Sequence, residues 1–269
     1  MKIVMHCVYF PPEVGGLESH VYMLCRALVR AGHAVTVVTS NSLPDLPAYE
    51  VMEGVEVHRT WFPGRNPIGW TAHAVGSMGR TYAEARDADI IHAQAFASVL
   101  PCARVAKRRK IPLVTTFHTS HFLMRADKAG WKGLLRRMVE VNDYSLAASV
   151  EIAEVGERLA PGHKVEALTN GVDTDDFSPV EPALRQGDQR RLIVPRRLFP
   201  KNGVEYFVRA MPLIREHEDV EALLIGDGPE REKLEALARD LGVRSYVQFL
   251  GRKAHNEMPP LLCSGEIAV

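Results

Sequence analysis

The sequence predicts an α/β protein with two domains, each built on a parallel sheet. Residues 3–10 form a nearly continuous apolar run, which is typical of a strand buried on both faces of such a sheet. Residues 17–31 follow with apolar positions at helical spacing, and a second apolar run spans 34–39. Together these segments predict a strand-helix-strand unit with a right-handed crossover. The same rhythm resumes after residue 190, which predicts the second domain.

The remaining elements of the first domain follow this rhythm. Gly32 follows the first helix, and we expect it to end that helix. Strands are predicted at 89–94, 111–117 and 165–168, with a helix-like stretch up to Lys110 after the first of them.

An acidic, turn-rich segment at 173–189 lacks apolar periodicity and is interpreted as an interdomain linker. We therefore expect an N-terminal domain at 1–180 and a C-terminal domain at 181–269. The second domain is predicted to contain strands at 191–195, 220–225 and 247–250, helices at 203–216 and from near Pro229 to Gly242, and the start of another strand at 266–269. Because a parallel sheet would normally continue from there, we expect this domain to be truncated.

Charge and cysteine content exclude several classes of protein. Lysine plus arginine equals aspartate plus glutamate, 33 against 33, so no global field favours nucleic acid. The 4 cysteines are scattered among apolar neighbours without metal or disulfide spacing. The apolar start is too short for a secretion signal or a spanning helix. These features predict a cytoplasmic protein without a metal site.

Ligands of open parallel sheets bind beyond the carboxyl ends of the strands, so the loops leaving strands are the candidates. Gly15 and Gly16 stand at the entrance to the first helix, where free backbone N–H groups would suit a phosphate. The alternative is a plain strand-to-helix turn, because the G-x-G-x-x-G fingerprint is absent.

His118 directly follows the apolar run at 113–117. A histidine there could donate a hydrogen bond at the edge of a cleft and titrate near neutrality. The alternative is a structural histidine at the end of a strand.

A basic loop lies between a strand and a helix of the second domain and contains Arg196, Arg197 and Lys201. Arginine binds phosphate oxygens through two parallel hydrogen bonds and lysine adds a point charge, which favours a diphosphate site over a solvated basic turn.

Gly226, Asp227 and Gly228 follow the next strand. The glycines allow a tight turn, and Asp227 could contact a nucleotide or, as we favour, cap the following helix.

Together these segments resemble the family-four retaining glycosyltransferases, which have the GT-B fold with two Rossmann-like domains. The matching stretches are FPPEVGGLESHVYMLCRALVRAGHAVTVVT, DIIHAQ, TTFHTSHF, LTNGVDTDDFSP, RRLFPKNGVEYFVRAMPLI, LLIGDGPEREKLEALARDLGV and VQFLG. The family includes phosphatidylinositol mannosyltransferases and enzymes that build capsules and lipopolysaccharide in the cell envelope.

The resemblance implies a metal-independent transfer of a hexose from a UDP- or GDP-sugar to an acceptor hydroxyl, with retention at the anomeric carbon and no cofactor. It implies that Gly16 lies against the donor diphosphate and His118 beside the transferred sugar, with Arg196 or Arg197 and Lys201 on the diphosphate oxygens. The acceptor would be a sugar, a lipid or a small molecule.

Two features depart from the family pattern. Lys201 stands one residue earlier than the usual lysine, with Asn202 before the glycine, so the arginines are the stronger candidates. The family's E-x7-E donor segment would follow residue 269. A non-catalytic or fragmentary nucleotide-binding module is therefore an alternative, as is an epimerase; a nicotinamide-dependent dehydrogenase fits less well.

A basic segment at 104–137 is the remaining candidate interaction surface. Its cations are Arg104, Lys107, Arg108, Arg109, Lys110, Arg125, Lys128, Lys132, Arg136 and Arg137. Apolar residues such as Trp131 and Leu134 interleave with the last of them, a pattern that could place the protein at the inner face of an anionic membrane. A solvated helix face is the alternative.

Overall fold

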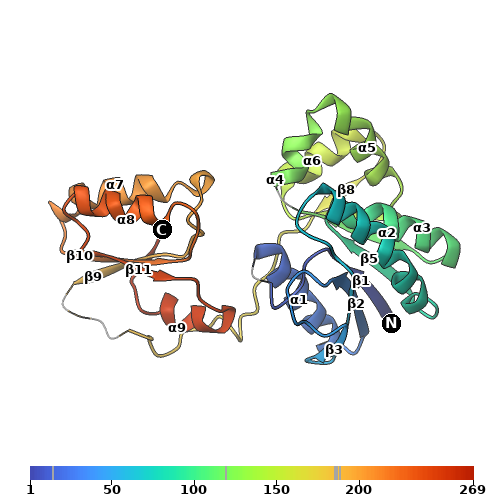
Figure 1. Ribbon diagram of the computed structural model, residues 1–269, viewed down its shortest axis with the longest axis horizontal. Helices are drawn as coiled ribbons and strands as arrows, with labels where there is room; N and C mark the ends of the chain where they lie inside the picture. Colours follow the sequence, from blue (N-terminus) through green and yellow to red (C-terminus); the bar gives the residue numbers. More distant parts are fainter. Residues whose placement is uncertain (14, 119, 185–186, 188) are drawn as a thin grey trace. The chain divides into compact units, whose positions relative to one another are not determined.

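The protein forms two compact units, Met1–Val172 and Asp173–Val269 (Figure 1). The computed structural model describes residues 1–13, 15–118, 120–184, 187 and 189–269. The second unit starts earlier than the 180/181 division expected from the sequence, because residues before 181 already pack within it. The Phe177 and His255 rings lie 4.9 Å apart between centroids.

The first unit contains an 8-stranded sheet in the order β3-β4-β2-β1-β5-β6-β7-β8. Neighbouring strands are parallel except β3 and β4, which form an antiparallel hairpin. The strands are β1 (Lys2–His6), β2 (Ala34–Ser40), β3 (Tyr49–Met52), β4 (Val55–Thr60), β5 (Ile90–Gln94), β6 (Leu113–Phe117), β7 (Tyr144–Ala147) and β8 (Val165–Ala167).

Helices cover both faces of this sheet. They are α1 (Gly16–Arg30), α2 (Pro67–Glu84), the short 3₁₀ helix η1 (Phe96–Ser98), α3 (Val99–Arg109), α4 (Ser120–Ala126), α5 (Ala129–Glu140) and α6 (Val150–Leu159). Because side chains alternate along a strand, Met5 packs in the cluster that contains Val21 of α1, whereas Val4 packs in the cluster that contains Val105 of α3. Both faces of β1 are therefore buried.

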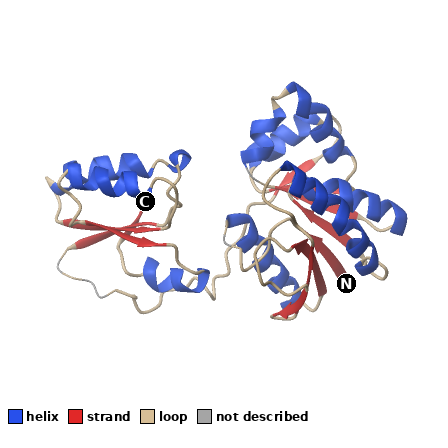
Figure 2. Ribbon diagram, viewed as in Figure 1, coloured by secondary structure: helices blue, strands red, loops and turns tan. Residues whose placement is uncertain are grey.

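The second unit has a 4-stranded parallel sheet in the order β11-β10-β9-β12. Its elements are β9 (Arg190–Val194), η2 (Pro200–Asn202), α7 (Val204–Arg215), β10 (Val220–Ile225), α8 (Arg231–Asp240), β11 (Val247–Gly251), η3 (His255–Glu257), α9 (Met258–Leu262) and β12 (Ile267–Ala268). Figure 2 shows α7 and α8 on one side of the sheet and α9 on the other. Accordingly, Val194 packs with Val208 of α7, and Ile193 packs with Leu261 of α9.

The predicted α/β architecture with parallel sheets is confirmed. Gly32 follows α1 with a φ of +85°, and Gly242 follows α8 with a φ of +71°, as expected for residues that end helices. The final strand also forms, and β12 pairs with β9.

Other expectations were wrong in detail. The first strand ends at His6, and Phe10 is apolar because it is buried in the following loop, with 2% of its surface exposed. Helix α8 begins at Arg231, after Pro229. The hairpin β3–β4 and helix α2 were not predicted. Helix α2 has little contrast between its faces, since the residues it buries include His73, Ser77 and Thr81.

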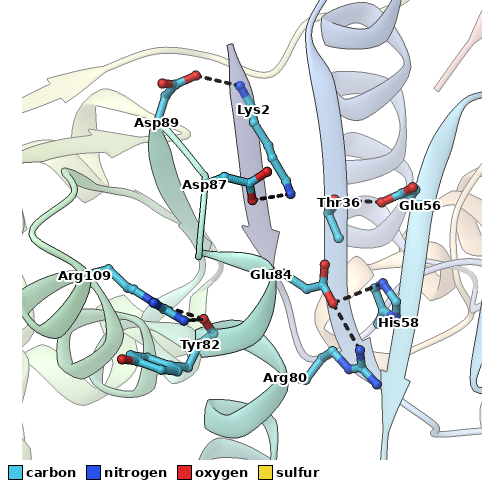
Figure 3. Close-up of polar contacts among 10 residues, drawn as sticks. All are labelled: Lys2, Thr36, Glu56, His58, Arg80, Tyr82, Glu84, Asp87, Asp89 and Arg109. Atoms are coloured by element: carbon cyan, nitrogen blue, oxygen red, sulfur yellow. Dashed lines mark hydrogen bonds and ion pairs between the residues drawn. The ribbon is translucent and has the colours of Figure 1, made fainter.

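Polar contacts join β1 to the start of β5 and helix α2 to β4 in the first unit (Figure 3). The Lys2 backbone N–H donates to Asp89 at 2.7 Å, and the Lys2 ammonium donates to Asp87 at 2.6 Å. Near the end of α2, Glu84 pairs with Arg80 at 3.1 Å and with His58 of β4 at 3.5 Å. The Lys2 contacts lie at the amino end of β1, whereas His58 pairs with Val38 of β2, which in turn pairs with His6 at the carboxyl end of β1. The candidate site lies beyond the carboxyl ends of the strands, where ligands of open parallel sheets bind.

The core of the second unit yields a stability prediction. Met211 of α7 is fully buried, whereas Leu213 of the same helix is 62% exposed. We expect Met211→Ala to lower the free energy of unfolding by about 2–5 kcal/mol, because it opens a cavity. The matched control Leu213→Ala should change it by less than about 0.5 kcal/mol. Urea unfolding measures both, and equal losses would contradict this account of the core.

Candidate functional site

The entrance to α1 has the geometry that a phosphate would need. Gly15 is the N-cap and Gly16 the first residue of α1, whereas Val14 lies outside the described residues. A Cβ atom added at Gly16 would meet no atom within 4 Å. The same atom at Gly15 would lie 2.2 Å from the Glu18 carboxylate, which is the movable end of a flexible side chain. The space beside Gly16 is therefore open, and its phosphate role stays a prediction.

His118 lies directly after β6 and is nearly enclosed, with 3% of its surface exposed. Its Nε2 atom lies 2.8 Å from Oε1 of Gln94, the last residue of β5. The ring of His20 on α1 lies 5.1 Å from that of His118 between centroids. Elements β5, β6 and α1 thus bring three polar side chains together.

The environment of His118 keeps its ring neutral. Burial, together with the neighbouring rings of His20 and His92, lowers its pKa to about 3. The expectation that His118 titrates near neutrality is therefore wrong, because the ring is withdrawn from water among other histidines.

A second pair of buried histidines lies at the end of β1. His6 Nε2 is 2.9 Å from the Ser77 hydroxyl, and His73 Nδ1 is 3.1 Å from the Thr60 hydroxyl. Their rings are 5.4 Å apart between centroids. Burial lowers the pKa of His6 to about 3 and that of His73 to about 4.

Sequence reasoning missed His6, His20, Gln94 and His73. His6 and Gln94 are the last residues of β1 and β5. Polar residues at the carboxyl ends of adjacent buried strands were a signal that could have found these two. His20 and His73 lie on helices and come close only through the tertiary fold.

In the second unit, the loop between β9 and α7 has exposed cations on either side of one buried leucine. Leu198 is 1% exposed and packs in the core beneath α7 and α8. Arg196, Arg197 and Lys201 are exposed. The Asn202 side-chain amide donates to the Arg197 carbonyl at 2.7 Å and so holds the loop closed.

The β10–α8 turn lies in backbone contact with that loop. A Cβ atom at Gly226 would lie 2.1 Å from the Arg196 carbonyl oxygen, and one at Gly228 would lie 2.2 Å from that of Leu198. These glycines are therefore required by close approach of the two backbones. Asp227 does not cap α8, whose N-cap is Glu230; its carboxylate accepts from the Gly228 N–H at 2.8 Å. The predicted capping role is wrong.

Most other cations of the second unit are neutralised by carboxylates. Examples are the pairs of Arg191 with Glu221 and of Arg209 with Glu205. In contrast, Arg196, Arg197 and Lys201 form no ion pair with any residue that the structure describes. The loop therefore concentrates positive charge at the start of α7, a 12-residue helix whose N-terminus adds to it.

A cavity of about 960 Å³ lies elsewhere, between α3 and α5 of the first unit. Its lining includes the cations Arg104, Lys107, Lys110 and Arg137 and the apolar residues Leu100, Ala103, Ile111 and Leu134. This groove is built from helix faces and the starts of β6 and β7, not from the carboxyl ends of the strands.

Among the described residues, no group of three or more histidine, cysteine, aspartate or glutamate side chains is arranged to hold a metal ion. In the same part of the chain, no helix combines the length and apolar character needed to span a bilayer.

Two family models together cover most of the chain. The model described as "Glycosyltransferase Family 4" matches residues 14–176, and the model described as "Glycosyl transferases group 1" matches residues 180–269.

Curated relatives match along nearly the whole chain. The phosphatidylinositol N-acetylglucosaminyltransferase GPI3 subunit of Saccharomyces cerevisiae is 26% identical over 99% of this chain, and the chain spans 62% of that relative's length. The GDP-mannose-dependent alpha-(1-6)-phosphatidylinositol monomannoside mannosyltransferase of Mycobacterium tuberculosis is 28% identical, with coverage of 93% of this chain and 67% of the relative.

Solved structures share the fold. Sucrose-phosphate synthase from Thermosynechococcus elongatus superposes with a TM-score of 0.80 at 18% identity, covering 99% of this chain and 74% of that one. Anabaena HepE in complex with UDP and glucose gives 0.73 at 19% identity, covering 100% and 73%. The chain therefore has the GT-B fold that was expected.

The buried histidines predict acid sensitivity. His6, His73, His92 and His118 are neutral when folded, with pKa values lowered to between about 3 and about 4, but protonate near pH 6.5 when unfolded. The unfolded chain therefore binds more protons below pH 6.5, and stability falls as pH drops toward 4, by up to about 1.4 kcal/mol per pH unit for each histidine.

Urea unfolding between pH 7.5 and 4.5 measures this slope. We expect His6→Asn to make it shallower and the control His163→Gln, at an exposed position, to leave it unchanged. An identical slope in His6→Asn and wild type would contradict the assignment.

Proposed function

This chain belongs to glycosyltransferase family 4, and we propose from that premise that it transfers a hexose from a UDP- or GDP-sugar to an acceptor hydroxyl. The observation that carries the proposal is the set of exposed cations Arg196, Arg197 and Lys201 in the loop before α7, none of which forms an ion pair with a described residue. A nucleotide sugar carries a diphosphate, which is the chemical group that such cations and a helix N-terminus bind.

The exposed loop would also assist the chemical step. When the bond between sugar and nucleotide breaks, negative charge grows on the departing diphosphate. Cations held in place before the reaction stabilise that charge where it develops. Leu198 and the glycines of the neighbouring turn fix the loop backbone from which the two arginine side chains extend.

The resemblance to the family supplies the finer assignments. We propose that Gly16 contacts the diphosphate, that neutral His118 lies beside the transferred sugar, and that the sugar is transferred with retention, without a metal ion or cofactor. Open space at Gly16 and the enclosed, polar surroundings of His118 support these roles. One relative is named for its dependence on GDP-mannose, and the HepE structure contains UDP and glucose, so both donor bases stay in the proposal.

A lipid acceptor is the second part of the proposal. The groove between α3 and α5 combines Arg104, Lys107, Lys110 and Arg137 with an apolar wall. None of these four cations forms an ion pair with a described residue, whereas Arg136 is paired with Glu140 at 2.6 Å. Such a surface suits peripheral contact with anionic lipid at the cytoplasmic face of a membrane.

The main rival is a nucleotide-binding module without transferase activity. It would bind UDP or GDP through the same loop but form no glycoside with any acceptor. An epimerase would release free nucleotide without an acceptor. Product analysis with labelled UDP- and GDP-sugars separates the three, and a labelled glycoside is the product that the proposal requires.

Titration calorimetry tests the donor site. We expect UDP or GDP to bind, and Arg196→Ala combined with Arg197→Ala to weaken binding by roughly 100-fold or more, since each lost charged hydrogen bond contributes about 1.5–3 kcal/mol. The matched control is Arg209→Ala, which removes an exposed arginine already paired with Glu205. Equal weakening in the control and the double variant would refute the assignment of the diphosphate to this loop.

Vesicle co-sedimentation tests the membrane contact. We expect binding to vesicles that contain anionic phospholipid and no binding to neutral ones. Arg104→Glu with Arg137→Glu should abolish it, because two groove cations become anions. Arg158→Glu with Arg239→Glu makes the same change in net charge at exposed positions outside the groove. Unchanged binding of the groove variant to anionic vesicles would contradict the proposed membrane contact.

A further inference from the structure

Gln94 is a buried polar side chain that the proposed chemistry does not use directly. It is fully enclosed at the end of β5. Its amide lies 2.8 Å from His118 Nε2, 3.1 Å from the Met5 sulfur and 3.3 Å from His92 Nε2. An enclosed amide needs partners for both its oxygen and its nitrogen, and here the oxygen has one partner and the nitrogen two.

The Met5 sulfur determines which way the amide faces. A thioether has no hydrogen and can only accept a hydrogen bond, so the NH₂ group of Gln94 is the end that faces Met5. The amide oxygen consequently faces His118. Because that oxygen can only accept, the hydrogen of the contact belongs to Nε2 of His118.

We propose that Gln94 is a positioning residue that holds His118 as the neutral Nε2–H tautomer and leaves the Nδ1 lone pair to accept a hydrogen bond from a ligand hydroxyl. The proposal rests on the proposed function only for the identity of that hydroxyl, which would belong to a sugar. In this arrangement His118 accepts a hydrogen bond and does not supply a proton.

Two further observations support this assignment. Nδ1 of His118 forms no hydrogen bond with any described residue, so it is available to a ligand. The pKa of His118 is lowered by burial and by His20 and His92, which disfavours the cation that would carry hydrogens on both ring nitrogens.

The opposite tautomer would be costly. Its Nε2 lone pair would face the lone pairs of Gln94 Oε1 across 2.8 Å, with both atoms withdrawn from water. Turning the amide over would relieve this repulsion, but its oxygen would then face the Met5 sulfur. The NH₂ group would lose the sulfur as its acceptor. One contact therefore depends on the other.

Nuclear magnetic resonance of protein labelled with ¹⁵N-histidine tests the proposal without any assay of activity. The His118 signals are identified by their loss in His118→Asn. In the wild type we expect a protonated Nε2, an unprotonated Nδ1, and an Nε2 hydrogen protected from exchange with water. A protonated Nδ1 in the wild type would overturn the proposal. This measurement is made on the wild-type protein and does not depend on whether any variant folds.

Variants then separate the hydrogen bond from simple packing. Gln94→Met keeps a side chain of similar length but removes the acceptor, so exchange of the Nε2 hydrogen should accelerate at least tenfold. Gln94→Glu restores an acceptor and should restore protection. Thr115→Val is the control, because the buried Thr115 hydroxyl donates to Asn142 at 2.7 Å and forms no hydrogen bond with His118, Gln94 or His92 among the described residues. Equal protection in Gln94→Met and wild type would contradict the proposal.

Kinetics with a nucleotide sugar form a separate arm. Gln94→Met should lower kcat about tenfold while nucleotide affinity stays within about twofold, because the amide contacts His118 and none of the cations proposed to bind the diphosphate. If the wild type transfers no sugar, the proposed function fails. The positioning role of Gln94 is then still tested, because the resonance experiment reports the tautomer of His118 independently of activity.

Discussion

Backbone contact between the loops that follow β9 and β10 is the constraint on which the proposed diphosphate site depends. The Leu198 N–H donates to the Asp227 carbonyl at 3.0 Å, and the Glu230 N–H donates to the Leu198 carbonyl at 3.1 Å. Only residues without a Cβ atom fit at positions 226 and 228. The same chain segment therefore buries Leu198 and presents Arg196 and Arg197 to solvent.

The charge balance of the chain hides this local concentration. The net charge is +0, and most cations of the second unit are paired with carboxylates. Cations that form no ion pair with a described residue lie in the loop before α7 and, in the first unit, along the groove between α3 and α5, whose lining also includes Asp143. The two places differ in character, because one is an exposed loop at a helix N-terminus and the other a groove with an apolar wall. This difference motivates assigning a diphosphate to the first and a lipid surface to the second.

Much of the fold could be predicted from the sequence, because buried parallel strands are apolar on both faces. The hairpin β3–β4 and helix α2 were missed, since α2 buries polar residues such as His73 and Ser77 and shows no clear apolar stripe. The Arg196–Arg197 loop could be found because its chemistry is local in sequence. The Gln94–His118 contact could not, because its partners are 24 residues apart and meet only when β5 and β6 pair. The lowered pKa of His118 likewise arises from tertiary burial.

The most direct test of the central claim is an experimental structure of the chain with UDP or GDP bound. The account predicts diphosphate oxygens within hydrogen-bond distance of Arg196 or Arg197, beside the N-terminus of α7. A diphosphate bound instead in the groove between α3 and α5, against Arg104 and Arg137, would contradict it and would make that groove the nucleotide site.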